Sequence, residues 1–480
     1  MKSILNRLVA FALILGFGIS CGDVEPLNVN PNEPTDIPAA SLVTEASLNL
    51  ANIYFGASFN YNYGMLMVQH IAQDEYTEES RYNFEAADFD FEWSEIYAVI
   101  LSDLSTAKGL IEENETLPAA QKANQIAVID ILMAFGFQMG TDIWGDMPYS
   151  EALNGDITQP VYDSQESIYS ALITSVSNAV ASINTGANGF SAAEDIIYNG
   201  NMDGWQKFGN AMLLRMGFRV ADRNSGLGSS TIAAALGGNI MSSVGDEANL
   251  VYRTEEALSN PFWFNQSPSG GTRDDYRVSA ELVTVLESMG DPRLPIYADE
   301  VAAGGFVGLP YGLNDIDAFA LKATTSDLGD MIETDPTFPG LFLRYSEVKF
   351  LTAEAIERGF ASGDAEAEFN AGITAAMNEW GITDAAAIAA YIAANPYDAA
   401  NWEESIGLQM WLAMYAQGHE AFSTWRRLDQ PALAVPAAAL EPAIPVRGLY
   451  PTDEGATNQE NLGAVPYTDA ISTRLWWDVN

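Results

Sequence analysis

The chain has 480 residues, of which 48% are hydrophobic and 11% aromatic, so its composition predicts a large folded core and excludes a disordered chain. Its 65 acidic and 21 basic residues give a formal net charge of −44, which excludes a nucleic-acid partner because phosphate binding needs a basic surface. The same charge disfavours polyanionic ligands, and we attribute it mainly to solubility in salty water.

The first twenty residues have the pattern of a secretory signal that ends in a lipidation site. Lys2 and Arg7 flank the start of an apolar run that ends at Phe17, and small residues lead from there to Cys21. The run is shorter than the roughly 20 residues that a membrane-spanning helix needs. Cys21 is the only cysteine, so no intramolecular disulfide is possible. We expect cleavage before Cys21 and acylation of that residue, which would attach the chain to a membrane.

An extended leader follows the cysteine. It is rich in Asn and Pro, as in Asn28 to Pro34, and it is therefore not helical. We predict three regions: a lipoprotein signal peptide over 1–20, a lipid-proximal leader over 21–40, and a single folded body over 41–480.

The folded body has mostly helical periodicity from about Leu42 onward. We expect roughly half of its residues in helices, against a base rate near one third. The pattern predicts helices over 92–113, 118–139, 164–183, 203–222, 341–360, 365–380 and 402–419. Breaks typical of loops fall at 74–90, 142–162, 186–201, 224–228 and 258–275. Short strands are predicted only over 248–252 and 444–446.

Catalytic motifs are absent from the sequence. His70 and His419 are the only histidines, and we interpret each as a packed residue. The motifs of zinc proteases, serine hydrolases and nucleotide-binding enzymes do not occur. Carboxylate pairs for glycoside hydrolysis are not excluded, since 65 acids form many chance pairs. Acidic runs such as Asp88 to Asp90 and Asp315 to Asp317 leave a calcium site possible.

Several motifs, in order along nearly the whole chain, carry a resemblance to a known family. The most specific is Asp142 to Ala152, a turn with Gly and Pro between aromatic residues. The others are Leu27 to Asn32, Tyr76 to Asn83, Arg344 to Val348, Glu420 to Arg427 and Ser472 to Asp478. Together they resemble the SusD-like (SusD/RagB) nutrient-binding lipoproteins of the outer membrane.

The resemblance implies a mostly α fold, with one SusD-like scaffold of divergent tetratricopeptide-like helix pairs, long loop excursions and few short strands. It also implies a surface-exposed, lipid-anchored protein without enzymatic activity. Its partner would be a SusC-like TonB-dependent transporter, to which it delivers an oligosaccharide or a peptide. The alternatives are an α-helical glycan-cleaving enzyme and a structural or adhesive surface lipoprotein.

The ligand site is expected on excursions outside the helical scaffold, where loops carry function on a rigid frame. We predict ligand contacts at Tyr76, Arg81, Tyr82, Trp263 and Tyr276, because no helical face requires these rings and exposed aromatics cost solubility. Arg81 would orient a hydroxyl or carbonyl of the ligand, or it would pair with Glu78 or Glu79 and only shape the loop. The loop over 304–317 is the second place to search.

Overall fold

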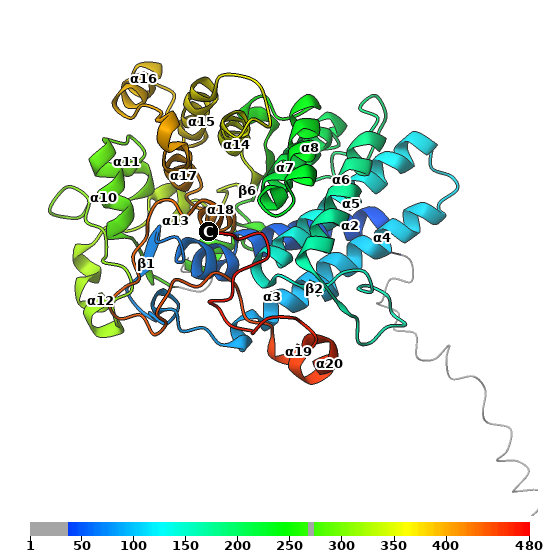
Figure 1. Cartoon of the computed structure of the whole chain (residues 1–480), viewed down its shortest axis with the longest axis horizontal. Helices are drawn as coiled ribbons and strands as arrows, with labels where there is room; N and C mark the ends of the chain where they lie inside the picture. Colours follow the sequence, from blue (N-terminus) through cyan, green and yellow to red (C-terminus); the bar gives the residue numbers. More distant parts are fainter. Residues whose placement is uncertain (1–36, 267–272) are drawn as a thin grey trace, which may run out of the picture. The chain divides into compact units, whose positions relative to one another are not determined.

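Helices that follow one another in the chain pack side by side through most of the folded body (Figure 1). The structure is a computed structural model, and it describes residues 37–266 and 273–480. The expectations for Cys21, the signal peptide and most of the leader lie outside the described residues. Residues Ala39–Asn480 form one unit, and 57% helix with few short strands confirms the predicted mostly α class.

The first helices confirm those predicted over 92–113 and 118–139. The chain runs through α2 (Ala39–Phe55) and the π-helix η2 (Ala57–Met65). The predicted helix over 92–113 is a continuous run made of α3 (Asp90–Ser94), η5 (Glu95–Leu101) and α4 (Ser102–Glu113). It packs against α5 (Ala119–Trp144), which begins after Pro118 and is longer than predicted. Helix α5 is terminated by Gly145, which follows Trp144 and has a φ of +84°.

The next helices pack in succession after α5. These are α6 (Gln165–Ser182), α7 (Met202–Ala221) and α8 (Ser225–Gly237). The prediction of a loop over 224–228 is wrong. The Asn224 side chain accepts a hydrogen bond from the backbone N–H of Leu227 at 3.1 Å, so the polar residue caps a helix and does not interrupt one.

The C-terminal half contains two further corrections. The predicted helix over 341–360 begins as strand β6 (Gly340–Leu343) and becomes α14 (Tyr345–Glu357) only afterwards. The predicted helix over 402–419 is split into α17 (Trp402–Ala413) and α18 (Gly418–Leu428). Ala416 has a φ of +64° at the break. Between these elements lie α15 (Ala365–Glu379), close to its predicted bounds, and α16 (Ala385–Ala394).

Three two-stranded antiparallel ladders join distant segments of the described chain. They pair β1 (Ile71–Gln73) with β5 (Tyr276–Val278), β2 (Met147–Pro148) with β3 (Tyr162–Asp163), and β4 (Ala248–Leu250) with β6. The predicted strand over 248–252 is therefore confirmed, whereas 444–446 is not a strand. The remaining helices include α9 (Pro261–Gln266), α10 (Ala280–Met289), α11 (Leu294–Tyr297), α12 (Asp315–Leu321), α13 (Asp330–Glu333), α19 (Thr452–Thr457) and α20 (Gln459–Leu462).

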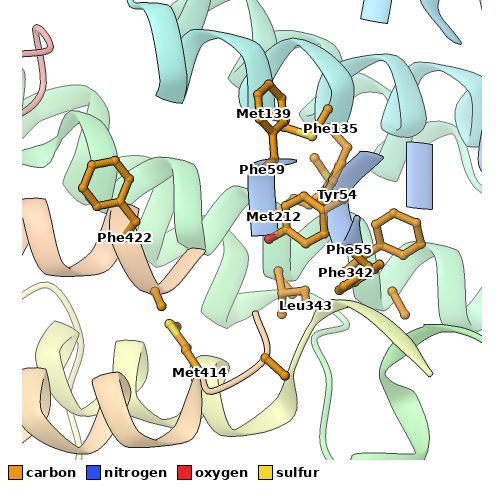
Figure 2. Packing of buried hydrophobic residues seen from close by; sticks show 14 of the residues in the cluster. Tyr54, Phe55, Phe59, Phe135, Met139, Met212, Phe342, Leu343, Met414 and Phe422 are labelled. Atoms are coloured by element: carbon orange, nitrogen blue, oxygen red, sulfur yellow. The ribbon is translucent and has the colours of Figure 1, made fainter. Parts of the chain in front are cut away.

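Aromatic rings from α2, α5 and β6 meet in the core (Figure 2). Tyr54 and Phe135 lie 5.0 Å apart between ring centroids, and Phe135 lies 5.1 Å from Phe342. By length and composition α5 could cross a membrane, but 83% of its apolar window is buried inside the protein. We therefore interpret α5 as a core helix.

A buried ion network lies beside this core. Arg215 pairs with Glu347 at 2.7 Å, and Arg219 donates to Glu420 at 2.5 Å, with all four side chains at most 2% exposed. Burial by itself raises the pKa of Glu420, but Arg215 and Arg219 hold it below its usual range. Arginines of α7 thus connect α14 to α18.

Candidate functional site

The β1–β5 ladder brings the two aromatic excursions of the sequence together. Gln73 lies opposite Tyr276 in this ladder. The backbone N–H of Asp74 extends the pairing by donating to the carbonyl of Asp275 at 2.8 Å. The segment that begins at Glu75 therefore leaves the ladder at a fixed position beside the segment that ends at Asp275.

A surface hollow of about 490 Å³, which we call the Tyr76 hollow, lies where this segment meets α12. Two exposed rings line it, those of Tyr76 (62% exposed) and Phe319 (59% exposed). The exposed side chain of Ile316 lies beside Phe319 on α12. Glu75 and Asp315 complete the lining. Figure 1 shows β1 and α12 on the same side of the body. The hollow thus offers apolar ring faces next to carboxylates.

Thr77 connects the two walls of the hollow. Its backbone N–H and its hydroxyl donate to the same carboxylate oxygen of Asp315, at 2.9 and 2.8 Å. These bonds hold the pKa of Asp315 below its usual range. An ionised Asp315 accepts hydrogen bonds from hydroxyl groups but donates none.

Lys322 forms ion pairs with two carboxylates next to the hollow. Its ammonium group lies 3.1 Å from Asp74 and 2.8 Å from Glu75. Burial raises the pKa of Asp74 to about 6, although Arg277 and Lys322 oppose the shift. Since both cations are already paired with carboxylates, the site presents net negative charge and favours neutral or cationic ligands over anions.

Tyr76 is held in an uncommon conformation. Its φ of +53° lies in the left-handed region, which non-glycine residues adopt rarely and at a cost. The guanidinium of Arg273 lies over its ring, 5.1 Å from the centroid. The protein therefore holds an exposed ring at a strained position beside a cation, which the fold alone does not require.

Two of the five predicted contact residues are not surface groups. Tyr82 and Tyr276 are only 1% and 3% exposed, so the expectation that no packed face requires these rings is wrong for both. The Tyr82 hydroxyl accepts a hydrogen bond from Gln69 at 3.4 Å. Tyr276 hydrogen-bonds Asn62, and its ring lies 5.9 Å from Phe262. In this conformation both rings belong to the core beneath the loops.

The other predicted contacts have different positions. Arg81 is partly buried, donates from Nε to the Thr77 carbonyl and hydroxyl at 3.2 and 3.0 Å, and lies 3.9 Å from Glu78. These contacts match the alternative in which Arg81 shapes its loop. Trp263 is half-buried on α9 and does not line the Tyr76 hollow. Only Tyr76 among the five combines exposure with a hollow.

Sequence reasoning missed Ile316 and Phe319 as site residues. They lie three residues apart on the outer face of α12, while Ala318 between them is buried. The segment 304–317 is the second region to search, and Asp315 and Ile316 within it line the hollow, whereas Phe319 lies outside both predicted regions. The signal in the sequence was a short helix with apolar residues on two faces, of which one face had to be exposed.

Carboxylates of the acidic runs considered for calcium already accept hydrogen bonds within the protein. Asp90 accepts from the Thr452 N–H at 2.7 Å, and Asp315 accepts from Thr77. A different cluster, Asp274, Asp327 and Glu333, has carboxylate oxygens within 4.8 Å of one another. Arg277 lies 2.8 and 2.7 Å from the first two, so a guanidinium already occupies part of the space between these carboxylates.

Neither histidine is available for acid–base chemistry. Burial lowers the pKa of both His70 and His419 to about 3. A glycoside hydrolase needs a protonated carboxyl near its substrate. In the Tyr76 hollow Asp315 has a lowered pKa, whereas burial raises the pKa of Asp74 beside the hollow to about 6. The hollow thus combines exposed rings and fixed hydrogen-bonding groups on a helical scaffold.

Consecutive helix pairs beneath this hollow define a helical scaffold protein, and comparison with known families agrees with this fold. A SusD-like family model described as "Starch-binding associating with outer membrane" matches residues 31–451. The chain belongs to this SusD-like family, which confirms the resemblance seen in its motifs. No curated protein matches the chain.

Solved structures show the same fold. A protein described as a chitin-binding protein is 25% identical, with a TM-score of 0.81 over 92% of this chain and 100% of its own. A chitin-binding SusD homologue from Flavobacterium johnsoniae is 22% identical, with a TM-score of 0.76 over 91% of this chain and 99% of its own. A SusD homologue from Bacteroides fragilis is 21% identical, with a TM-score of 0.79 over 92% and 100%.

Proposed function

We propose that the protein is a lipid-anchored surface protein of the outer membrane that binds a neutral oligosaccharide at the Tyr76 hollow and delivers it to a SusC-like transporter. The observation that carries the ligand proposal is the pair of exposed rings, Tyr76 and Phe319, in one hollow. Apolar faces of sugar rings stack on aromatic side chains, and carboxylates accept bonds from sugar hydroxyls. A peptide with apolar side chains is the second candidate, since the same rings suit it.

The ligand class follows from the charge and from the family. The carboxylates of Glu75 and Asp315 disfavour anionic sugars. The structure that is 25% identical carries the description chitin-binding. We therefore place N-acetylglucosamine oligomers first among the ligands to test, with malto-oligosaccharides and mixed peptides beside them.

The test is calorimetric titration of the full-length chain in detergent with the N-acetylglucosamine hexamer. Tyr76→Ala and Phe319→Ala should each weaken binding roughly tenfold, because a stacked ring contributes about 1 kcal/mol or more. Val251→Ala is the matched control, since Val251 is 67% exposed but lies outside the hollow. Equal affinity in all three variants would remove the hollow from consideration, and new reducing ends during incubation would support the enzyme alternative.

The lipid anchor is tested separately. Cys21→Ser should leave the protein in the soluble periplasmic fraction, because acylation of Cys21 is the proposed attachment. If the variant still sediments with outer membranes after a high-salt wash, the anchor lies elsewhere.

The transporter partner rests on family membership. Mild detergent extraction of a tagged chain at native expression should recover a large β-barrel protein in stable proportion. Recovery of the tagged chain by itself would contradict the pairing while leaving the glycan proposal open.

A further inference from the structure

A second hollow, which we call the Phe91 hollow, has a volume of about 300 Å³ and lies between the end of α2 and the α3–η5 run. Its walls include Asn49 and Asn52 on α2 together with Phe91, Glu92 and Glu95. It shares no lining residue with the Tyr76 hollow. Any function of this hollow is therefore separate from the proposed one.

Glu92 is the unusual residue of this hollow. Glu92 is only 3% exposed. One of its carboxylate oxygens, Oε2, has no hydrogen-bond partner within the described ranges 37–266 and 273–480. Burial raises the pKa of Glu92, and a hydrogen bond from Ser58 opposes the shift only in part. Buried acceptors are normally satisfied, so an unpartnered carboxylate oxygen on a residue that lines a hollow indicates a donor that arrives with a ligand.

The charge around Glu92 identifies the kind of donor. No residue lining the Phe91 hollow is basic, and Glu95 adds a second, half-exposed carboxylate. A neutral hydroxyl would satisfy the hydrogen bond of Oε2 but not the charge of the carboxylates. A protonated amine would satisfy both, because charge-assisted hydrogen bonds are the stronger class.

Phe91 and the two asparagines fit the same ligand. The Phe91 ring is 64% exposed at the edge of the hollow, and cations are attracted to the face of an aromatic ring. The amide groups of Asn49 and Asn52 can both donate and accept, which suits hydroxyl groups next to an amine. The Asn52 oxygen accepts from the Tyr252 hydroxyl at 3.3 Å, which orients that amide.

We propose that the Phe91 hollow binds a primary ammonium group flanked by hydroxyls, the chemistry of an amino-sugar unit without its acetyl group. The ammonium group donates to Glu92 and Glu95 and lies over the Phe91 ring. The sugar hydroxyls bond to Asn49 and Asn52. The Tyr76 hollow has no part in this recognition.

The experiment uses the full-length chain in detergent and two probes, the glucosamine hexamer and the N-acetylglucosamine hexamer. Titrations are made in a Tyr76→Ala/Phe319→Ala background, so that binding at the Tyr76 hollow does not contribute. The glucosamine hexamer should still bind in this background, more weakly as salt is raised, and the acetylated hexamer should bind at least tenfold more weakly.

Glu92→Gln in the same background should weaken glucosamine-hexamer binding at least tenfold, because it removes the charge at nearly constant shape. Phe91→Ala should weaken it about threefold, in line with a partly exposed cation–π contact, and it removes little packing because the ring is exposed. Glu113→Gln, an exposed acid at the end of α4, is the matched control and should change nothing.

Three results would overturn the proposal. These are loss of glucosamine-hexamer binding in the Tyr76→Ala/Phe319→Ala background, equal affinity for both hexamers there, or full affinity in both Glu92→Gln and Phe91→Ala. Circular dichroism on each variant establishes that the fold is retained. Failure of the acetylated hexamer to bind the unmodified chain would contradict only the proposed function of the Tyr76 hollow.

Discussion

The indole N–H of Trp477 donates a 2.9 Å hydrogen bond to the carboxylate of Asp142, across 335 positions of sequence. Trp477 is 1% exposed, and the guanidinium groups of Arg219 and Arg426 lie 5.2 and 5.0 Å from its ring centroid. Two motifs that marked the family in the sequence, Asp142 to Ala152 and Ser472 to Asp478, therefore meet inside the protein. The contact between Asp142 and Trp477 thus helps to close the fold.

Trp477→Ala should destabilise the protein by about 3–5 kcal/mol, because it removes a buried indole and leaves the Asp142 carboxylate short of a donor. Urea unfolding followed by fluorescence or circular dichroism measures the loss. The neighbouring Trp476 is half-buried, so Trp476→Ala should cost clearly less. Equal stability of the two variants would show that the terminal segment is not locked through Trp477.

Gly145→Ala should also destabilise the fold, by about 1–3 kcal/mol. Gly145 has a φ of +84°, and a Cβ atom there would lie 2.7 Å from the Tyr467 hydroxyl oxygen. Gly155→Ala is the matched control in the following loop, since a Cβ atom at Gly155 meets nothing within 4 Å. We expect that control to stay within about 0.5 kcal/mol of the unchanged chain in urea unfolding. The idea fails if both variants unfold at the same urea concentration.

Stability should rise as the pH is lowered from 8 towards 5. Burial, with the carboxylates of Asp327 and Asp274, raises the pKa of Glu333 to about 7 from a usual value of 4.5, and Arg277 opposes this only in part. The folded protein therefore binds a proton between pH 7 and 4.5 that the unfolded chain does not bind, so folding is favoured as pH falls through this window. We expect the melting temperature to increase by roughly 2 °C or more across it.

Glu333→Gln should remove much of this pH dependence, and Glu366→Gln, a change to an exposed acid on α15, should preserve it. Below this window the trend reverses, because Glu420 has a lowered pKa and its ion pair with Arg219 is lost on protonation. A flat melting temperature between pH 8 and 5 in the unchanged chain would contradict the assignment for Glu333.

The sequence predicted the helices better than the ligand surface, and the physical reason differs between residues. Helical periodicity repeats over many residues, so α6, α7 and α15 were found close to their observed bounds. A tyrosine in a loop carries no such redundancy. Tyr76 and Tyr82 lie in the same excursion, yet the first is exposed and the second is buried by packing against distant segments.

Ile316 and Phe319, which were not named as site residues, show the same limit of prediction from sequence. Ile316 and Phe319 are ordinary apolar positions of a short helix, and only the contact between Thr77 and Asp315 shows that they face the Tyr76 loop. That contact joins positions 238 residues apart. The strand β6 was read as the start of a helix because its apolar run continues into α14 and its partner β4 lies about ninety residues earlier in the chain.

The last prediction concerns the connection between the two walls of the Tyr76 hollow. Thr77→Val removes the hydroxyl that donates to Asp315 at 2.8 Å and accepts from Arg81 at 3.0 Å, and Thr77 itself does not line the hollow. The backbone bond from the Thr77 N–H to Asp315 remains. We expect a loosened α12 wall and about fivefold weaker binding of the N-acetylglucosamine hexamer, corresponding to roughly 1 kcal/mol for one hydrogen bond.

Thr116→Val is the control for this change. Thr116 also donates through both its N–H and its hydroxyl to one side-chain oxygen, that of Asn114, at 2.9 and 2.7 Å, in a turn outside the hollow. It should leave the affinity unchanged. If Thr77→Val binds the hexamer as tightly as Thr116→Val does, while Tyr76→Ala still weakens binding, then the rings act without a fixed wall. If the unchanged chain binds no hexamer at all, the ligand proposal fails first, and the connection through Asp315 is then a feature of the fold alone.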